Sequence, residues 1–565
     1  MDIKALREQA RAEAREFLEK DKEYRMGYIE AEKPHPLTRE LSQTYAASME
    51  EGVRLLLSVD HEMACRAAQT LAGEAYATFA ECVRKTIANG GRVIFSGCGS
   101  SGRLSMRLEQ SWRNAVAKLS ELYPRAKDAL EEKLEAVGNI MTGGDYAVIR
   151  AVESFEDSTK LGEEQARELG LGEGDLLVGV TATGETTSIL GTAMQALRDG
   201  ASVYMLICAD HKPLIEKMSR ARIVYNDPKC GVMFLPCGPM ALTGSTRMQS
   251  STFEQLAGCV ALEGALHDIL QSCGVEDGFR DYGWYGDRFV DVTTQLMRER
   301  AVDALAEASY REQAVYENGG LITLYADEFL LDVLTDTTER SPTFMTPPFC
   351  SADMVQNEQS WAFVKNPTCG TEEAWVSCFL REPNCIEWTK DKYAQLGLNE
   401  KQIEKIPDIS AKALKRFLIG NEPMQQREEI PNSHAMWVDA KHAPASFGEI
   451  SKRYASSSSL TIEDAGVELP ETGMDIFEHL CIKLMLNTLS TGVMARMGRI
   501  DGNWMTCLAM SNKKLVDRSA RIVSDVCGVP YEIALEEIYY SRALTEAQGL
   551  SRSAAQETIR RLGVK

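Results

Sequence analysis

The sequence predicts an α/β protein with two doubly wound parallel sheets. Short apolar runs recur along the chain, and each is followed by a turn and then by residues with helical spacing. This alternation is typical of parallel sheets covered by helices. The length of 565 residues exceeds the ~100–200 residues of one typical domain, so two such domains are expected.

Strands are expected where a short apolar run ends in a turn. These runs lie at residues 92–96, 175–180, 202–208 and 232–235 in the first half, and at 321–325 and 374–380 in the second. Residues 1–90 and 250–317 have helical spacing, as does the chain from residue 474. Residues 420–472 contain prolines and four consecutive serines, which predict irregular chain. The expected parts are an N-terminal helical segment at 1–50, a first α/β domain at 51–260, a second at 261–472 and a C-terminal helical cap at 473–565.

Composition and charge exclude several kinds of partner. The formal net charge of −21 is unlike the basic surface that nucleic acids or anionic membranes require. No apolar run is long enough to span a bilayer, and residues 1–7 read as a charged helix, not as a signal peptide. The fifteen cysteines form no CxxC pair and no Cys/His cluster with zinc spacing. We expect a cytoplasmic protein with reduced thiols, no metal, no cofactor, and neither a nucleic acid nor a membrane as partner.

The first chemical signal follows the first expected strand. Residues 97–103 read Gly-Cys-Gly-Ser-Ser-Gly-Arg and lead into a helix expected from about Leu104. Glycines allow a tight turn, serine hydroxyls donate hydrogen bonds, and a helix start offers free N–H groups, which together suit a phosphate. The spacing matches neither a dinucleotide fingerprint nor a Walker loop. A plain Gly-rich turn is the structural alternative.

Two further segments could complete an anion site. Residues 181–188 read Thr-Ala-Thr-Gly-Glu-Thr-Thr-Ser at another strand–turn–helix junction, and such junctions converge at the carboxyl edge of a parallel sheet. One of these hydroxyls is expected to be a helix cap, but four exceed that need. Residues 242–248 contain Ser245 and Arg247. Arg247 either clamps an anion or stabilises a turn.

Together these segments resemble those of sugar-isomerase (SIS) domain proteins. The segments at 97–103, 151–157, 242–248 and 483–492 occur in the order found in the N-acetylmuramic acid 6-phosphate etherase family and in the glucokinase regulatory protein family. The full length is similar to the regulatory family, because the etherases are shorter and pair two identical chains. The resemblance implies two SIS-type, flavodoxin-like sandwiches and a sugar-phosphate ligand.

The resemblance also implies which residues contact the ligand. Matched one by one, the contacts fall on Gly99, Ser100, Ser101, Gly102, Arg103, Glu153, Thr181, Thr183, Gly184, Thr186, Ser245, Arg247 and Lys483. Thr183 replaces a serine of the etherase pattern, Glu185 replaces an arginine, and Ser154 with Phe155 replaces Gly-Ala. A carboxylate at position 185 would repel a phosphate unless it points away or contacts another part of the sugar.

The etherase pattern Asp-x-x-Glu-x-x-Pro-Thr-Phe is present, but in the second half of the chain. It matches residues 336–344, whereas the first half has Leu-Glu-Gln-Ser-Trp at 108–112 in its place. Conversely, the second half has Tyr-Ala-Asp-Glu at 325–328 where a Gly/Ser loop would stand. We expect one composite site, with phosphate held by the first half and the matched catalytic Glu339 supplied by the second. The structural alternative is that both halves have decayed. Glu156 and Asp157 match the etherase Glu-Asp pair and are the other expected catalytic residues.

Three functions remain open from these residues. A carboxylate can remove the proton beside the carbonyl of an opened amino-sugar phosphate, and a second acid can protonate the ether oxygen as lactate leaves. Aldose–ketose isomerisation starts with the same proton abstraction, so lyase and isomerase are not separated. The resemblance to the regulatory family implies the alternative of a non-catalytic sensor that binds a sugar kinase, and a relative that has lost ligand binding is a third reading. The chain is expected to be a monomeric pseudo-dimer or a homo-oligomer.

Overall fold

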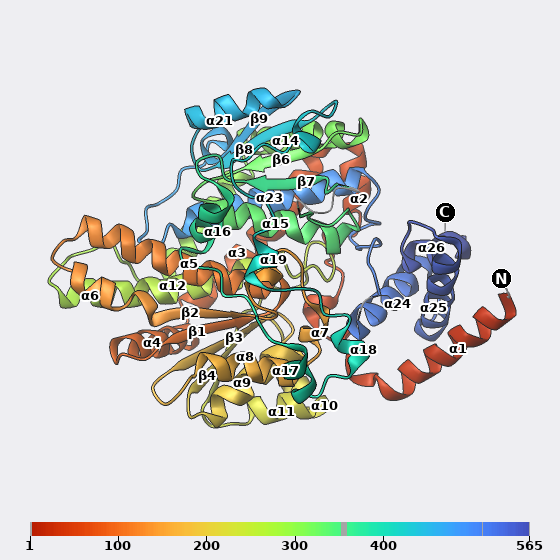
Figure 1. The fold of residues 1–565 in the computed structure, drawn as a ribbon, viewed down its shortest axis with the longest axis horizontal. Helices are drawn as coiled ribbons and strands as arrows, with labels where there is room; N and C mark the ends of the chain where they lie inside the picture. Colours follow the sequence, from red (N-terminus) through yellow and green to blue (C-terminus); the bar gives the residue numbers. More distant parts are fainter. Residues whose placement is uncertain (1–2, 352–358, 511, 564–565) are drawn as a thin grey trace.

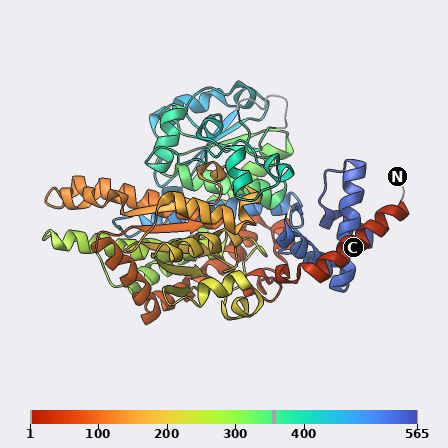
Figure 2. The ribbon, with the colours of Figure 1, turned by 60° about the horizontal axis from the view of Figure 1, so that its bottom comes forward.

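The computed structural model describes residues 3–351, 359–510 and 512–563. Within these residues the chain forms two parallel sheets, as the sequence predicts, with long helices between them (Figure 1). A smaller helical lobe stands to one side and carries both described ends of the chain. Figure 2 shows the same lobe apart from both sheets.

The first sheet has five parallel strands in the order β2-β1-β3-β4-β5. This is the flavodoxin-like order, in which the strand sequence reverses between β1 and β3. Glycine and small residues at the carboxyl ends of these two strands leave room for a ligand there. The strands are β1 (Val93–Gly97), β2 (Val137–Met141), β3 (Leu176–Thr181), β4 (Ser202–Ile207) and β5 (Cys230–Phe234).

The second sheet has four parallel strands in the order β7-β6-β8-β9, which repeats the first four positions of the first sheet. The loop after β6 carries Asp327 and Glu328 instead of a Gly/Ser turn. The strands are β6 (Ile322–Tyr325), β7 (Ala362–Lys365), β8 (His434–Asp439) and β9 (Ser456–Thr461).

Helices surround both sheets. Those before and around the first sheet are α1 (Ile3–Lys20), α2 (Leu41–Ala47), α3 (Met49–Leu71), α4 (Glu74–Ala88), α5 (Gly99–Leu122), α6 (Lys127–Glu132), α7 (Glu153–Glu156), α8 (Thr159–Leu169), α9 (Thr187–Arg198), α10 (Lys212–Lys217), α11 (Ser219–Tyr225) and α12 (Gln249–Ser272). Those around the second sheet are α13 (Tyr282–Leu296), α14 (Glu299–Glu317), α15 (Leu330–Phe344), α16 (Thr371–Phe379), α17 (Lys390–Gln395), α18 (Glu400–Ile403), α19 (Ala411–Leu414), α20 (Gln425–Glu428), α21 (Ala445–Ile450) and α22 (Ile462–Ala465). The C-terminal region adds α23 (Ile476–Arg496), α24 (Lys513–Cys527), α25 (Tyr531–Gln548) and α26 (Ala554–Leu562).

The layer between the sheets is built on α23. This helix is buried on every side, and it packs against α3, α12, α14 and α15. Its sequence is apolar or small almost throughout, which is typical of a helix in the core and not of a surface helix. Because α15 also contacts α5, the helix that carries the etherase pattern lies beside the helix that follows the first Gly/Ser loop.

Ion pairs attach the helical lobe to the N-terminal segment. The buried carboxylate of Glu32 accepts hydrogen bonds from Arg518 and Arg521 on α24, at 2.6 and 2.7 Å. Burial raises the pKa of Glu32, but the two guanidinium groups outweigh it and hold that pKa at about 2. Helix α1 lies along α25 in the same lobe (Figure 1). The two ends of the sequence therefore form one structural unit.

Three secondary-structure predictions were wrong in part. Of the strand expected at 374–380, residues 374–379 belong to helix α16, where Ala374, Trp375 and Cys378 are buried at helical spacing. Residues 420–472 contain β8 and β9, and the serine run is an edge strand whose hydroxyls bond both ring nitrogens of His434. The helix expected from about Leu104 starts earlier, at Gly99.

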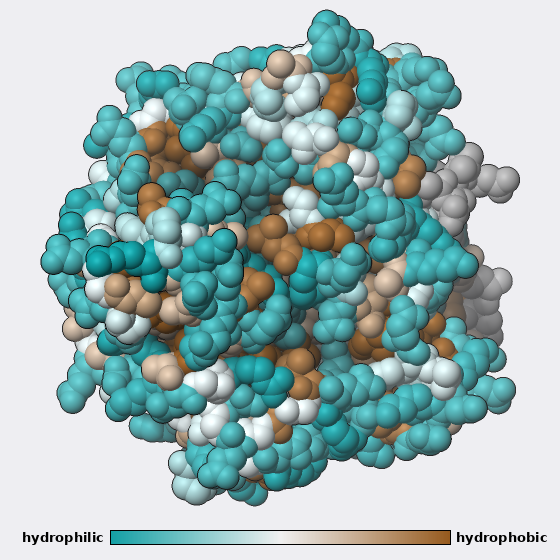
Figure 3. All heavy atoms as spheres, turned by 60° about the vertical axis from the view of Figure 1, so that its left-hand side comes forward, coloured by the Kyte–Doolittle hydropathy of each residue, from teal (hydrophilic) through white to brown (hydrophobic). Residues whose placement is uncertain are grey.

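The surface in Figure 3 is mostly hydrophilic, with apolar side chains gathered in hollows between polar ones. No helix in the described ranges is long and apolar enough to cross a membrane.

Candidate functional site

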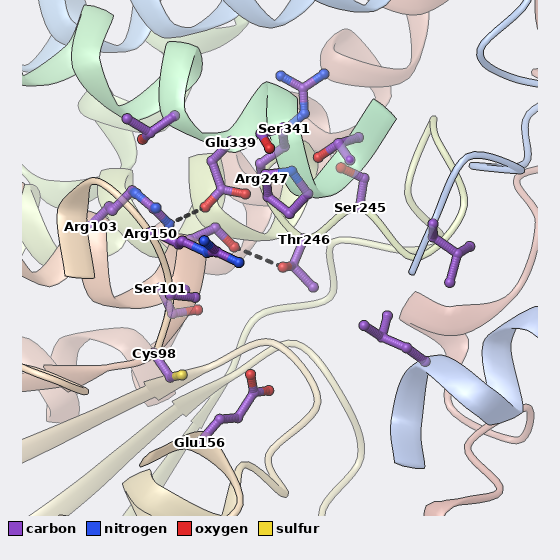
Figure 4. A pocket seen from close by; sticks show the side chains of 18 of the residues that line it. Cys98, Ser101, Arg103, Arg150, Glu156, Ser245, Thr246, Arg247, Glu339 and Ser341 are labelled. Atoms are coloured by element: carbon purple, nitrogen blue, oxygen red, sulfur yellow. Dashed lines mark hydrogen bonds and ion pairs between the residues drawn. The ribbon is translucent and has the colours of Figure 1, made fainter. Parts of the chain in front are cut away.

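A cavity of about 620 Å³ opens at the carboxyl ends of β1 and β3. This is the point at which the strand order of the first sheet reverses, where ligands of open α/β sheets bind. Three parts of the chain line it: the loops of the first sheet, the end of α15 with the segment that follows, and the start of α24. Figure 4 shows side chains from these parts pointing into one space.

The N-terminus of α5 forms one wall of the cavity. Gly99, Ser100 and Ser101 line it, and no acidic residue lies in the first turn of the helix. The first N–H groups of a helix lack intrahelical partners and carry the positive end of its dipole, so this wall suits an anion. The hydroxyl of Ser100 lies 2.7 Å from that of Thr246, and Ser101 lies 3.2 Å from a carboxyl oxygen of Glu254.

Gly102, predicted as a ligand contact, does not line the cavity. A Cβ at this position would lie 2.2 Å from the sulfur of Met141 and 2.8 Å from the carbonyl oxygen of Gly97. The glycine is therefore needed because α5 packs directly on the sheet. Gly99 instead needs its freedom for the turn, since its φ is +56° with open space beside it.

The hydroxyl-rich turn after β3 forms the adjacent wall. Thr181, Thr183 and Thr186 all line the cavity, as predicted from their positions, and the hydroxyls of Thr181 and Thr186 are 2.9 Å apart. Gly184 does not line it, and its φ of +74° places it at the bend of the turn.

The side chain of Glu185 does not line the cavity. Its carboxylate accepts a hydrogen bond from Arg220 at 3.3 Å and one from Thr183 at 3.4 Å. Burial raises the pKa of Glu185, while Lys514 and Arg220 oppose that rise. The carboxylate at position 185 is thus turned toward a cation, which removes the expected conflict with a phosphate.

Ser245 and Arg247 line the cavity, but the guanidinium of Arg247 is already engaged. It donates to Asp336 at 2.8 Å, to Ser490 at 3.0 Å and to Thr491 at 2.7 Å. These contacts join the loop of the first domain to α15 and α23. Arg247 therefore fixes the domain interface, and little of its charge is left for a bound anion.

Glu339 reaches the cavity from the second domain. It lies on α15 and forms an ion pair with Arg103 of α5, and both side chains line the cavity (Figure 4). Arg103 also donates to the carbonyl of Val148 at 3.0 Å. The expected juxtaposition of the Gly/Ser loop and residue 339 is present in the structure.

Of the three predicted acidic residues at 153–157, only Glu156 is seen to line the cavity. In Figure 4 it lies on the side away from Glu339, with Ser101 between them. Asp157 is an exposed residue outside the lining, and the side chain of Glu153 lies outside the described part of the structure. Phe155 packs away from the cavity, stacked on Trp388 with ring centroids 5.7 Å apart.

Lys483 lies behind the main cavity, in a side cavity of about 30 Å³ that Ser100, Arg103 and Glu339 also line. Its ammonium donates to the carbonyl of Arg247 at 2.6 Å and to Thr252 at 2.8 Å. Burial lowers the pKa of Lys483 to about 8. Lys483 therefore lies close to the site, but its ammonium donates its hydrogen bonds to protein groups.

Further cationic residues that were not predicted from the sequence also line the cavity. Lys514 on α24 lines it, and among the described residues it has no hydrogen-bond or ion-pair partner. Burial lowers the pKa of Lys514, but the carboxylates of Glu156 and Glu185 outweigh burial and raise it above its usual value. Arg150 lines the exposed rim. No local motif marks either residue, and α24 brings Lys514 to the site only through the tertiary fold.

Comparisons with known proteins found a family model, curated relatives and solved structures that are similar to this chain. Residues 76–197 match the family model described as the glucokinase regulatory protein N-terminal SIS domain. The N-acetylmuramic acid 6-phosphate etherase of Photorhabdus laumondii is 30% identical over 267 residues, which are 46% of this chain and 78% of that protein. The etherase of Aliivibrio fischeri (strain MJ11) is 32% identical over 180 residues, 32% of this chain and 51% of that protein, so here the chain spans about half the length of its relative. A solved tagatose-6-phosphate ketose/aldose isomerase from Escherichia coli aligns with 81% of this chain and 96% of its own, at 8% identity and a TM-score of 0.40.

Proposed function

The chain belongs to the N-acetylmuramic acid 6-phosphate etherase family, and from this premise we propose that it is a carbon–oxygen lyase acting on a phosphorylated amino sugar. The substrate favoured by the names of its relatives is N-acetylmuramic acid 6-phosphate. The observation that carries the proposal is that Glu339 of one domain and the N-terminus of α5 of the other line the same cavity.

The phosphate is assigned to the α5 end of the cavity. Backbone N–H groups at Gly99–Ser101 and the threonine hydroxyls after β3 supply neutral donors there. Lys514 supplies positive charge there, because Arg247 and Lys483 already donate hydrogen bonds to other groups of the protein. A chain of net charge −21 can hold an anion in this way, because the donors are local.

Glu339 is assigned as the general base. In the opened sugar, the carbonyl at C1 acidifies the proton on C2, and a carboxylate fixed beside the cavity can take that proton. Arg103 holds the carboxylate in position from the first domain. As the C2–C3 double bond forms, the C3–oxygen bond breaks and lactate leaves.

Glu156 is assigned as the second acid–base group. It lines a different wall from Glu339, so it can reach the leaving oxygen while Glu339 faces C2. The carboxylate of Glu156 is among the groups that raise the pKa of Lys514. Each positioned proton transfer contributes ~10²–10⁴-fold in rate.

A sensor that binds a sugar kinase would need the same phosphate site without turnover. The names of the curated relatives favour the lyase. Because both halves of the composite site come from one chain, the proposal requires one chain and no second copy.

The test is incubation of the purified protein with N-acetylmuramic acid 6-phosphate and measurement of released lactate. We expect turnover by the wild type and a loss of ~10²–10⁴-fold in kcat for Glu339→Gln. Glu328→Gln is the matched control, because Glu328 is exposed after β6 and lies outside the cavity. Binding of N-acetylglucosamine 6-phosphate without any lactate release would reject the lyase and favour the sensor.

A further inference from the structure

Glu254 lies directly behind the N-terminal turn of α5. It is on α12, its exposed fraction is 0%, and one carboxyl oxygen is 3.2 Å from the hydroxyl of Ser101. The other oxygen is 3.8 Å from the sulfur of Cys208, at the end of β4. Among the described residues no cation forms an ion pair with Glu254. A buried carboxyl group therefore lies behind the α5 wall of the cavity, and the first turn of α5 itself contains no acidic residue.

The surroundings of Glu254 do not favour its charged form. An isolated buried carboxylate is costly, and burial raises the pKa of Glu254 to about 8. Its hydrogen bonds to Ser101 and Cys208 and the charge of Lys483 on α23 oppose this rise only in part. Burial also raises the pKa of the Cys208 thiol well above its usual value, so that thiol is neutral.

Two other titratable groups face this region. Cys237, after β5, lies beside Cys208 and contributes to the raised pKa of that thiol. Asp60 on α3 shares Lys483 with Glu254, and burial raises the pKa of Asp60 to about 7. One lysine thus interacts electrostatically with two buried acids. It cannot neutralise both, which leaves Glu254 without a full countercharge.

Resting on the phosphate site proposed above, we infer that Glu254 is a positioning residue that acts through Ser101. In its neutral form the carboxyl O–H donates to the hydroxyl oxygen of Ser101. The proton of Ser101 is then free to donate to a phosphate oxygen in the cavity. When Glu254 loses its proton it becomes only an acceptor, draws the Ser101 proton back, and places a negative charge behind the bound anion.

This arrangement makes anion affinity depend on pH through one buried side chain. We expect the affinity of the wild type for N-acetylglucosamine 6-phosphate to fall by about tenfold or more between pH 7 and pH 9.5, as one charge appears close to the phosphate. In Glu254→Gln the side chain cannot ionise, and its amide N–H replaces the donor to Ser101. This variant should bind as the wild type does at pH 7 and show a smaller fall as pH rises.

The experiment is isothermal titration calorimetry of N-acetylglucosamine 6-phosphate with both proteins from pH 7 to pH 9.5. Lys483 also titrates in this window, but it is present in both proteins, so the difference between the two profiles belongs to Glu254. Superimposable profiles, or weaker binding by Glu254→Gln at pH 7, would overturn the inference and leave the proposed function standing. Absence of binding by the wild type at pH 7 would overturn both.

Infrared difference spectroscopy gives a readout that does not depend on the variant's affinity. The wild type minus Glu254→Gln spectrum should contain the C=O band of a protonated carboxyl group at pH 7, and this band should vanish by pH 9.5. A carboxylate signal from Glu254 already at pH 7 would contradict the assignment.

Discussion

Arg103 on α5 and Glu339 on α15 form a buried ion pair across the boundary between the two α/β domains. Their side chains are 2% and 13% exposed. Arg103 follows the Gly/Ser loop, and Glu339 is the glutamate of the etherase pattern, so the pair joins the two parts of the site that different halves of the chain retain. This ion pair holds the carboxylate of Glu339 at the cavity wall. It also joins the two domains.

Replacing Arg103 by Met should destabilise the protein and abolish lactate release together. The substitution leaves the carboxylate of Glu339 without its partner in a poorly solvated place, at a cost of about 3 kcal/mol or more. The double variant Arg103→Met with Glu339→Gln should regain part of the lost thermal stability, because no charge is then left unpaired. Thermal unfolding measures this, and strictly additive losses in the double variant would show that the pair is not coupled.

Replacing Lys514 by Met should weaken binding of N-acetylglucosamine 6-phosphate by about 10–100-fold, the range for a lost hydrogen bond to a charged group. Lys513→Met is the matched control, because Lys513 is half exposed and pairs with Asp21 at 2.5 Å outside the cavity. Calorimetry at pH 7 compares the two. Equal affinities for the two variants would remove Lys514 from the site.

Replacing Gly102 by Ala should damage the fold more than replacing Gly99 by Ala. At Gly102 the added carbon meets Met141 and the backbone of Gly97, so α5 must move off the sheet. At Gly99 the space is open and only a positive φ opposes the side chain, which costs about 1 kcal/mol. Thermal unfolding should show a larger drop for Gly102→Ala, and the reverse order would mean that Gly102 does not serve packing.

Replacing Asp60 by Asn should stabilise the protein increasingly as pH rises from about 4 to about 7. Burial raises the pKa of Asp60 to about 7 in the folded state, so the folded protein holds a proton that the unfolded chain has lost. Stability from this group is complete below its unfolded pKa and is lost as pH rises through the folded one. The gain for Asp60→Asn at pH 7 should be roughly 2–4 kcal/mol. A difference in melting temperature that does not change between pH 4 and pH 7 would contradict this.

The class of fold and the chemistry of each loop could be predicted from local patterns of residues. Apolar runs followed by Gly- or Thr-rich turns are local patterns, and they predicted β1, β3, β4 and β6. They also predicted the cavity walls that contain residues 99–101 and Thr181, Thr183 and Thr186. The placement of the etherase pattern on residues 336–344 also predicted that Glu339 would have to meet the loop of the other half. Each of these conclusions depends on residues close together in the chain.

Which side chains are available to a ligand depends on contacts between distant parts of the chain. Arg247 and Lys483 look like anion ligands in the sequence. In the structure, Arg247 donates to side chains of α15 and α23, and Lys483 donates to Thr252 and to the carbonyl of Arg247. Lys514 has no motif around it, yet α24 carries it to the cavity from more than 400 residues along the chain from Ser101. The reason is physical: hydrogen-bonding capacity and burial depend on neighbours in space, and the local pattern of residues does not encode them.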